Sequence, residues 1–397
     1  MRGIPHVAVL IETSRAYGRG LLEGVARYNR QHGPWSLYFE PHGLDDAPPR
    51  WLSGWKGDGI LARINTPRVA RAVLATGLPA VDLRRGVPGL ALPFIGVHNE
   101  AVARMAFEHM ADRGLRHFAV CGLAPGVYHY LDVRCEFFRR KVEAAGHDCH
   151  VYRPNFGRRR PTWEEEQDEI VAWLRGLPRP VGVMACNDDR GLQILDACRR
   201  AGVTVPEEAA VIGVDNDTVL CNMADPPMSS IDVNPVQIGY EATALLDRLM
   251  RQARRGSRPP VSLEMVPRGI VTRQSSDVLA VGDPDVAAAV RFIRANACRG
   301  IGVGDVLRHV PLSRSALERR FKIVLRRSPK EEIPRVQLDR ARQLLGESDL
   351  ALEVVADRCG FSSCKYFGDA FRRELGVRPG AFRRRCHSAA AAAPEVE

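Results

Sequence analysis

Short apolar runs alternate with amphipathic helical stretches through the first 275 residues of the chain. The apolar runs predict β-strands over residues 7–11, 36–40, 59–62, 80–82, 118–121, 182–185 and 210–214. Between them, helical spacing of apolar residues predicts helices over residues 20–31, 100–113, 135–145, 163–175 and 191–201. Strands that are apolar along their whole length are typical of parallel sheets covered by helices on both faces. The pattern therefore predicts two doubly wound α/β lobes, a class of fold that binds ligands at the carboxyl ends of its strands.

The pattern changes close to residue 275. From Pro284 onward the sequence is helical throughout, with short turns and many arginines. We therefore expect an α/β domain over residues 1–275, a linker over 276–283, an all-α domain over 284–386 and a disordered, alanine-rich tail over 387–397. The all-α domain holds 22 Lys and Arg against 12 Asp and Glu, an excess equal to the net charge of +10 of the whole chain. A basic excess confined to one domain favours a polyanionic partner for that domain.

The all-α domain contains an internal repeat with an offset of 50 residues. Ser313, Leu317, Phe321 and Pro329 recur as Ser363, Phe367, Phe371 and Pro379. Each serine suits an N-cap, since its oxygen can accept a hydrogen bond from a free backbone N–H, and the two apolar residues after it share one helix face. A shorter amphipathic helix precedes each serine, over residues 303–309 and 352–358. Helix, tight turn and capped helix form the helix-turn-helix plan, whose second helix enters the major groove of DNA.

Polar side chains are expected on the outer face of each capped helix. In the first repeat they are Ser313, Arg314, Ser315, Glu318, Arg319 and Lys322, and in the second Ser363, Cys364, Lys365 and Arg372. Arginine can read guanine with two hydrogen bonds, while lysine and serine can hold phosphate groups. We predict that these residues contact double-stranded DNA.

Five segments of the repeat carry a family signature. They are LSRSALERRF at 312–321, ARQLL at 341–345, CGFSS at 359–363, YFGDAF at 366–371 and GVRP at 376–379. Over residues 285–385 the chain resembles the AraC/XylS-type DNA-binding domain, in which a long helix joins two helix-turn-helix units. The resemblance implies a transcription regulator, more often an activator than a repressor, that binds paired promoter half-sites as a homodimer and works with RNA polymerase.

Three positions depart from that family. Gln337 replaces an arginine and Arg326 replaces a glycine, while Pro334 falls where the joining helix should begin. Proline fits the first turn of a helix but not its interior. We therefore expect the joining helix to start close to Pro334.

Segments of the α/β domain carry a second resemblance. His98-Asn99, residues 108–120, Val205-Pro206 and residues 211–216 are similar to the effector domain of lac-repressor-type regulators, which are related to periplasmic sugar-binding proteins. The resemblance covers residues 5–273 and implies two lobes that close on a small sugar. By position it implies the ligand residues Arg134, Asn187, Asp188, Asp215 and Asn216, and it places His98 where the family usually has aspartate.

These residue types suit a sugar. Carboxylates and amides can satisfy hydroxyl groups that both donate and accept hydrogen bonds, and arginine donates in a fixed fork. Tyr17 and Arg63 are further candidate ligand contacts, and Tyr17 or Tyr128 could cover the apolar face of a sugar ring.

The order of the two parts narrows the expected effector. A sensor of this kind usually follows its DNA-binding helices, whereas here the helix-turn-helix repeat comes last. That order, with Ala16-Tyr17 and residues 55–59 and 296–301, resembles AraC-type regulators with such a sensor and implies D-xylose. There are two alternatives. The chain could be a regulator of the same architecture that binds another aldose, or a sugar-binding protein without regulatory function.

Other functional classes have little support. A GxGxxxG pattern at Gly18–Gly24, with Glu40 ending the next predicted strand, is the feature that favours a nucleotide-binding enzyme, but it departs from GxGxxG. We find no GxSxG, HExxH or P-loop motif, so no catalytic residue and no cofactor is predicted.

The ten cysteines form no CxxC pair or Cys/His cluster, which argues against a metal site. No apolar run reaches about 18 residues, so we expect no membrane span and a cytoplasmic protein with reduced thiols.

Overall fold

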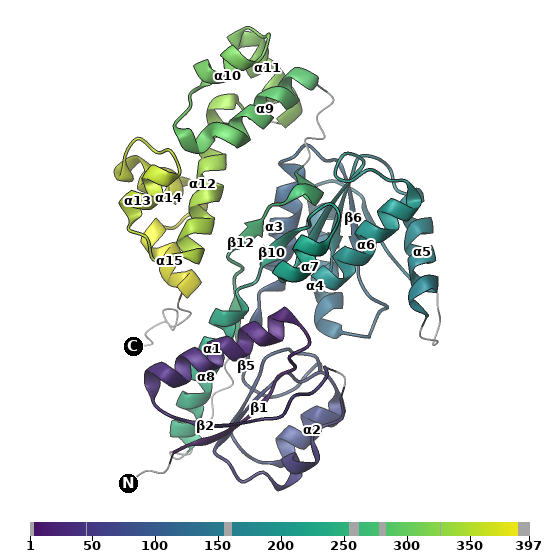
Figure 1. Cartoon of the computed structure of the whole chain (residues 1–397), viewed down its shortest axis with the longest axis vertical. Coiled ribbons are helices and arrows are strands. Elements are labelled where there is room, and N and C mark those ends of the chain that lie inside the picture. The colour runs from purple at the N-terminus through teal and green to yellow at the C-terminus, as the bar shows by residue number, and fades with distance from the viewer. Residues whose placement is uncertain are drawn as a thin grey trace.

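The computed structural model contains two α/β lobes followed by a helical domain, and it describes residues 4–44, 46–154, 161–253, 262–277, 283–325 and 327–387. Each lobe is built on a six-stranded sheet (Figure 1). The predicted fold class is therefore confirmed. Arg326, most of the expected linker and nearly all of the expected tail lie outside the described residues.

The sheet of the first lobe is wholly parallel, with the order β11-β5-β4-β3-β1-β2. Its strands are β1 (His6–Leu10), β2 (Ser36–Phe39), β3 (Gly59–Ala62), β4 (Ala80–Asp82), β5 (Phe94–Val97) and β11 (Ser262–Met265). The helices of this lobe are α1 (Ala16–His32), α2 (Pro67–Ala75) and α8 (Pro235–Ala253). A Cβ atom on Gly24 or Gly239 would collide with the backbone of the opposite helix, so these glycines let α1 and α8 pack at backbone contact.

The sheet of the second lobe has the order β12-β10-β9-β8-β6-β7, and only β12 is antiparallel to its neighbour among these described strands. Its strands are β6 (His117–Cys121), β7 (Cys149–Val151), β8 (Val181–Ala185), β9 (Ala209–Val214), β10 (Ser229–Asp232) and β12 (Gly269–Val271). Its helices are α3 (Asn99–Ala111), α4 (His129–Ala144), α5 (Trp163–Arg175), α6 (Asp188–Ala201) and α7 (Thr218–Met223). The chain passes between the lobes at residue 98, at 233–234 and at 266–268, which makes these short segments the natural hinge.

The helical domain consists of two groups joined by a long helix (Figure 1). Its helices are α9 (Pro284–Asn296), α10 (Val303–His309), α11 (Arg314–Leu325), α12 (Pro329–Glu347), α13 (Leu352–Arg358), α14 (Cys364–Leu375) and α15 (Pro379–His387). Leu317 and Phe321 lie in the core of the first group, and Phe367 and Phe371 lie in the core of the second. The internal repeat therefore corresponds to two separate hydrophobic cores, each closed by the apolar face of its capped helix.

The joining helix α12 begins earlier than the sequence predicts. Ser328 caps it and forms a capping box with Glu331, so Pro329 is its first residue and Pro334 lies inside the helix. The expectation that the helix starts close to Pro334 is wrong, because the capping box and the first-turn proline provide a stronger start signal. Gln337, which replaces the family's arginine, is buried and donates from Nε2 to the carbonyl oxygens of Ala297 and Gly360, each at 2.9 Å. This one amide therefore joins the two helix-turn-helix groups.

The second lobe contacts the helical domain directly. Asp112, which ends α3, accepts hydrogen bonds from Arg327 at 3.2 Å and from Arg335 at 2.6 Å. Further along α12, Gln343 donates to the carbonyl oxygen of Ile270 in β12 at 2.8 Å. At the hinge, Asn234 donates to the carbonyl oxygen of Cys386 in α15 at 2.9 Å. Sensor and helical domain are therefore linked by polar contacts, one of which reaches a hinge segment.

Candidate functional site

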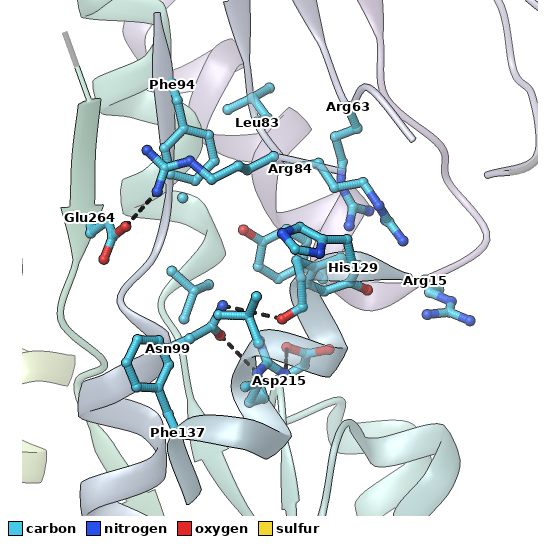
Figure 2. Close-up of a pocket in the computed structure, with 17 residues that line it drawn as sticks. Arg15, Arg63, Leu83, Arg84, Phe94, Asn99, His129, Phe137, Asp215 and Glu264 are labelled. Atoms are coloured by element: carbon cyan, nitrogen blue, oxygen red, sulfur yellow. Dashed lines mark hydrogen bonds and ion pairs between the residues drawn. The ribbon is translucent and has the colours of Figure 1, made fainter. Parts of the chain in front are cut away.

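A cavity of about 290 Å³ lies between the two lobes (Figure 2). The first lobe contributes Arg15, Tyr17, Arg63, Leu83, Arg84, Arg85, Phe94, Gly96, Val97 and Glu264, and the second contributes Asn99, His129, Tyr130, Val133, Arg134, Phe137 and Asp215. Arg63, Leu83 and Asp215 directly follow strands β3, β4 and β9. The cavity therefore occupies the carboxyl ends of the parallel strands, where ligands bind in doubly wound folds.

Arg134 and Asp215 form the polar floor contributed by the second lobe. Arg134 is almost fully buried and donates from Nε to Asn99 Oδ1 at 2.9 Å and from Nη1 to the carbonyl oxygen of Cys186 at 2.6 Å. Its Nη1 lies 4.0 Å from Asp215 Oδ1. Burial raises the pKa of Asp215, while the nearby positive charges of Arg134 and Arg63 oppose the rise. The guanidinium thus has fixed geometry, and the carboxylate beside it offers acceptor capacity to a ligand.

The backbone at Asp215 is held in an uncommon conformation. Its φ is 109°, in the region that favours glycine, and its N–H donates to the carbonyl oxygen of Ile231 at 3.0 Å. Strained non-glycine residues persist where the surrounding structure fixes them, and they occur often at ligand sites. The strain at Asp215 therefore supports a ligand-binding role for its carboxylate.

Five arginines line the cavity, and four of them have a carboxylate within 4.0 Å. The pairs are Arg15 with Asp189 at 3.6 Å, Arg63 with Glu12 in a short contact, Arg85 with Glu264 at 2.8 Å and Arg134 with Asp215 at 4.0 Å. Arg84 is the fifth, and it lies in ion-pair distance of no carboxylate in the described part of the chain. Burial, together with the positive charge of Arg84, lowers the pKa of Arg63 to about 9.

Aromatic and aliphatic side chains complete the wall. Tyr17 is buried beneath the guanidinium of Arg63, whose carbon lies 4.8 Å from the ring centre. Phe94 and Phe137 lie on the other side of the cavity in Figure 2, away from Arg63. The cavity thus offers both polar groups and apolar surface, which suits a compound that carries both hydroxyl groups and C–H faces.

Four predicted ligand residues line the cavity, and three do not. Tyr17, Arg63, Arg134 and Asp215 are brought together there. Asn187 instead caps α6 and accepts from the N–H of Arg190 at 3.0 Å, and Asn216 accepts from Arg273 at 3.0 Å. Asp188 is buried behind the wall, where its carboxylate accepts from the hydroxyl of Ser230 at 2.6 Å and the N–H of Asp217 at 2.7 Å. Burial raises its pKa well above the ordinary value. These placements do not support Asn187, Asp188 and Asn216 as effector ligands.

Two further predicted positions, His98 and Tyr128, do not line the cavity. His98 occupies the segment between the lobes, and its Nδ1 accepts from the N–H of Ala101 at 3.2 Å, so it caps α3. Tyr130 lines the cavity, whereas Tyr128 does not. The cavity is also lined by Arg15, Arg84, Asn99 and Glu264, which were not among the predicted ligand residues. Arg84 could have been found, since it follows the predicted strand at 80–82 by two residues and so falls at its carboxyl end.

The helical domain presents two capped helices to solvent. Ser313 Oγ accepts from the N–H of Ala316 at 3.3 Å, and Ser363 Oγ accepts from the N–H of Tyr366 at 3.1 Å, so both predicted caps are present. Of the predicted DNA contacts, Arg314, Ser315, Glu318, Arg319, Lys322, Lys365 and Arg372 are exposed together with the two serines, and Cys364 is half-buried. None of the five cations among them pairs with a carboxylate of a described residue. Their charges are therefore available to phosphate groups or base edges.

Two family models match the chain. A periplasmic binding protein-like domain matches residues 107–276, and a helix-turn-helix domain matches residues 306–385. The xylose operon regulatory protein of Haemophilus influenzae is 29% identical over 96% of this chain and 98% of its own length. That of Escherichia coli K12 is also 29% identical, over 95% and 96%. The chain thus combines a periplasmic-binding-protein-like sensor domain with an AraC-type helix-turn-helix domain.

Solved structures agree with this assignment. The structure of the xylose-binding transcription activator xylR is 28% identical, with a TM-score of 0.62 over 96% of this chain and 98% of that chain. The complex of the transcriptional regulator CelR with cellobiose shares the fold of the sensor, with a TM-score of 0.54 over 68% of this chain and 84% of that chain. The AraC-type regulator described here is thus a sugar-responsive, DNA-binding transcription regulator and not an enzyme. None of the helices in its described residues is both long and apolar enough to cross a membrane.

Proposed function

We propose that this AraC-type regulator controls a sugar-utilisation operon and takes its effector in the cavity between the lobes. The observation that carries the proposal is that both lobes line this cavity, in a chain whose other domain exposes two capped, cationic helices. Asn99, Arg134 and Asp215 offer both donors and acceptors, as the hydroxyl groups of a sugar require.

D-xylose is the effector to test first. Two relatives are named for the xylose operon, and the similar solved structure is described as a xylose-binding activator. The cavity of about 290 Å³ lies at the lower end of the usual range for small-molecule sites, which favours a monosaccharide over a longer sugar. Another aldose of the same size is the alternative.

Effector binding would favour the closed arrangement of the lobes. A sugar that touches Arg63 of the first lobe and Arg134 of the second adds contacts that exist only when the lobes are close. A ligand shifts such an equilibrium only by its difference in affinity for the two states. The hinge contact between Asn234 and Cys386 then offers one route by which closure reaches the helical domain.

The helical domain would read DNA with both capped helices. Helices α11 and α14 would enter two successive major-groove segments, about 34 Å apart along the duplex. Arg314 and Arg319 would read base edges, and Lys322 and Lys365 would hold phosphates. Two chains would form a homodimer on paired promoter half-sites in the cytoplasm, and the effector-bound dimer would activate transcription through RNA polymerase.

The test is a calorimetric titration of the full chain with D-xylose, L-arabinose, D-ribose, D-glucose and D-galactose. Arg134→Met keeps the aliphatic volume of the side chain but removes its donors, so sugar affinity should fall about tenfold to a hundredfold. Arg139→Met is the matched control, because Arg139 lies on the same helix and pairs on the surface with Glu136 and Glu143. Equal sugar affinity in wild type and Arg134→Met would refute the assignment of the cavity as the effector site.

A further inference from the structure

Arg84 is buried in the wall of the effector cavity, and its guanidinium has no hydrogen-bond partner among the described residues. Its side chain is 4% exposed, and none of Nε, Nη1 and Nη2 has a partner in the described part of the chain. The guanidinium lies over the rings of Tyr130 and Tyr128, with its carbon 4.3 Å and 4.9 Å from the ring centres. In Figure 2, Arg84 and Arg63 reach toward the cavity from the same lobe.

The carboxylate of Asp82, two residues before Arg84, is already bound to the backbone. Asp82 Oδ1 accepts from the N–H groups of Ile64 at 3.3 Å and Arg84 at 2.9 Å, and its Oδ2 accepts from the N–H of Arg85 at 3.0 Å. Asp82 therefore fixes the turn that carries Arg84, but it lies outside the cavity lining and makes no ion pair with the guanidinium. The other four cavity arginines each have a carboxylate within 4.0 Å, so Arg84 stands alone as an uncompensated charge.

A buried guanidinium without a partner is strongly unfavourable unless something compensates its charge. The tyrosine rings compensate only in part, because a cation over an aromatic face gains less than one paired with a carboxylate. The rings leave the N–H groups of the guanidinium without a hydrogen-bond partner in the described part of the chain. These form a planar fork that matches the two oxygens of a carboxylate.

We propose that the effector is a sugar acid, whose carboxylate pairs with Arg84, in preference to a neutral aldose. This inference rests on the proposed function of the cavity as the effector site, and it specifies the charge of the effector. One uncompensated guanidinium matches one negative charge. The hydroxyl groups of the same ligand would face Asn99, Arg134 and Asp215 of the second lobe, so the molecule bridges the two lobes.

The experiment compares neutral and acidic sugars on the full chain by calorimetry. The ligands are D-xylose, D-xylonate, D-gluconate, D-glucuronate and D-xylose 5-phosphate. A sugar acid should bind at least about tenfold more tightly than D-xylose. In Arg84→Met its affinity should fall about tenfold to a hundredfold, whereas that of D-xylose should change little. The ligand-free variant should not melt at a lower temperature than wild type, because the substitution removes a buried, unpaired charge.

Arg71→Met is the control, since Arg71 is an exposed residue of α2 in the same lobe and lies outside the cavity. D-xylose binding as tightly as every acid would overturn the inference but leave the sugar sensor intact. Tightest binding of D-xylose 5-phosphate would replace the carboxylate by a phosphate and overturn the sugar-acid assignment. Binding of none of the compounds would overturn both this inference and the proposed effector site.

Discussion

Gly360 determines how closely the two helix-turn-helix groups approach each other. Its φ is +75°, and an added Cβ would lie 2.7 Å from the carbonyl carbon of Cys298. Gly376 has almost the same backbone conformation, with φ +71°, but its Cβ would meet nothing within 4 Å. A comparison of substitutions at these two glycines therefore distinguishes the energy of left-handed backbone from the energy of close packing between the groups.

Gly360→Ala should destabilise the chain clearly more than Gly376→Ala. Left-handed backbone alone makes alanine roughly 1–2 kcal/mol less favourable than glycine, and this applies to both variants. At Gly360 the collision of the added Cβ with the backbone of Cys298 destabilises the chain further. It also displaces the carbonyl group of residue 360, which accepts a hydrogen bond from Gln337. Urea unfolding of both variants measures the difference. Equal free energies of unfolding would mean that the contact between the groups relaxes without loss.

The sequence predicted some of the residues that line the effector cavity, but not which of its arginines lacks an acidic partner. Arg134, Asp215, Tyr17 and Arg63 were expected at the cavity and lie there. Asn187 has a suitable side chain after a suitable strand, yet it caps a helix, because short polar residues satisfy local N–H groups equally well. Arg84 was missed because its importance lies in the lack of an acidic partner, and pairing is set by tertiary packing.

Elements differ in how far the sequence predicts them. The helices at 163–175, 303–309 and 352–358 have the predicted bounds. Regular helical periodicity defines the first, and the turns before Ser313 and Ser363 bound the two short ones. Strand β10 was missed, since its sequence Ser-Ser-Ile-Asp is largely polar although its first three residues are buried. The hydroxyl group of Ser229 donates to the carbonyl oxygen of Arg273, a partner 44 residues away, which no local pattern reveals.

Helix α11 carries the prediction for DNA recognition. Arg314→Ala and Arg319→Ala should each lower specific DNA affinity by roughly 1–3 kcal/mol, because each removes a contact to a base edge. The loss of that contact should also reduce discrimination between sequences. Lys322→Ala should weaken binding to all sequences and reduce the slope of affinity against salt by about one. Fluorescence anisotropy with a duplex selected from a random library, at several salt concentrations, measures both effects.

The control for these variants is Arg291→Ala. Arg291 is an exposed arginine on α9, a helix that precedes the first helix-turn-helix unit. The Arg291→Ala substitution removes the same charge from the same domain, but outside the two capped helices. It should therefore leave discrimination between sequences unchanged. Wild-type affinity in both arginine variants of α11 would show that another face of the domain reads DNA.

At the scale of the whole molecule, Asp112 links the sensor to the joining helix. Its side chain pairs with Arg327 and Arg335, and its carbonyl oxygen accepts a further hydrogen bond from Arg327 at 2.8 Å. On the other side both arginines contact Glu332, which is fully buried within the helical domain. Burial alone would raise the pKa of Glu332, but hydrogen bonds and charge from the two arginines hold it below its ordinary value. The arginines therefore keep an acidic partner even without Asp112.

Asp112→Asn should weaken communication between effector and DNA while leaving the helical domain folded. The ratio of DNA affinities with and without saturating effector should fall about fivefold, since coupling energies of this kind are typically 1–3 kcal/mol. Glu108→Gln is the matched control, because Glu108 lies one turn earlier on α3 and pairs with Arg104 of the same helix at 3.1 Å. Anisotropy titrations with the selected duplex, using whichever compound binds in the calorimetric panel, give the ratio for each variant. If Asp112→Asn retained the wild-type ratio, Asp112 would not carry the signal. Other contacts between the sensor and the helical domain would then be tested next, among them those of Gln343, Asn234 and Arg116.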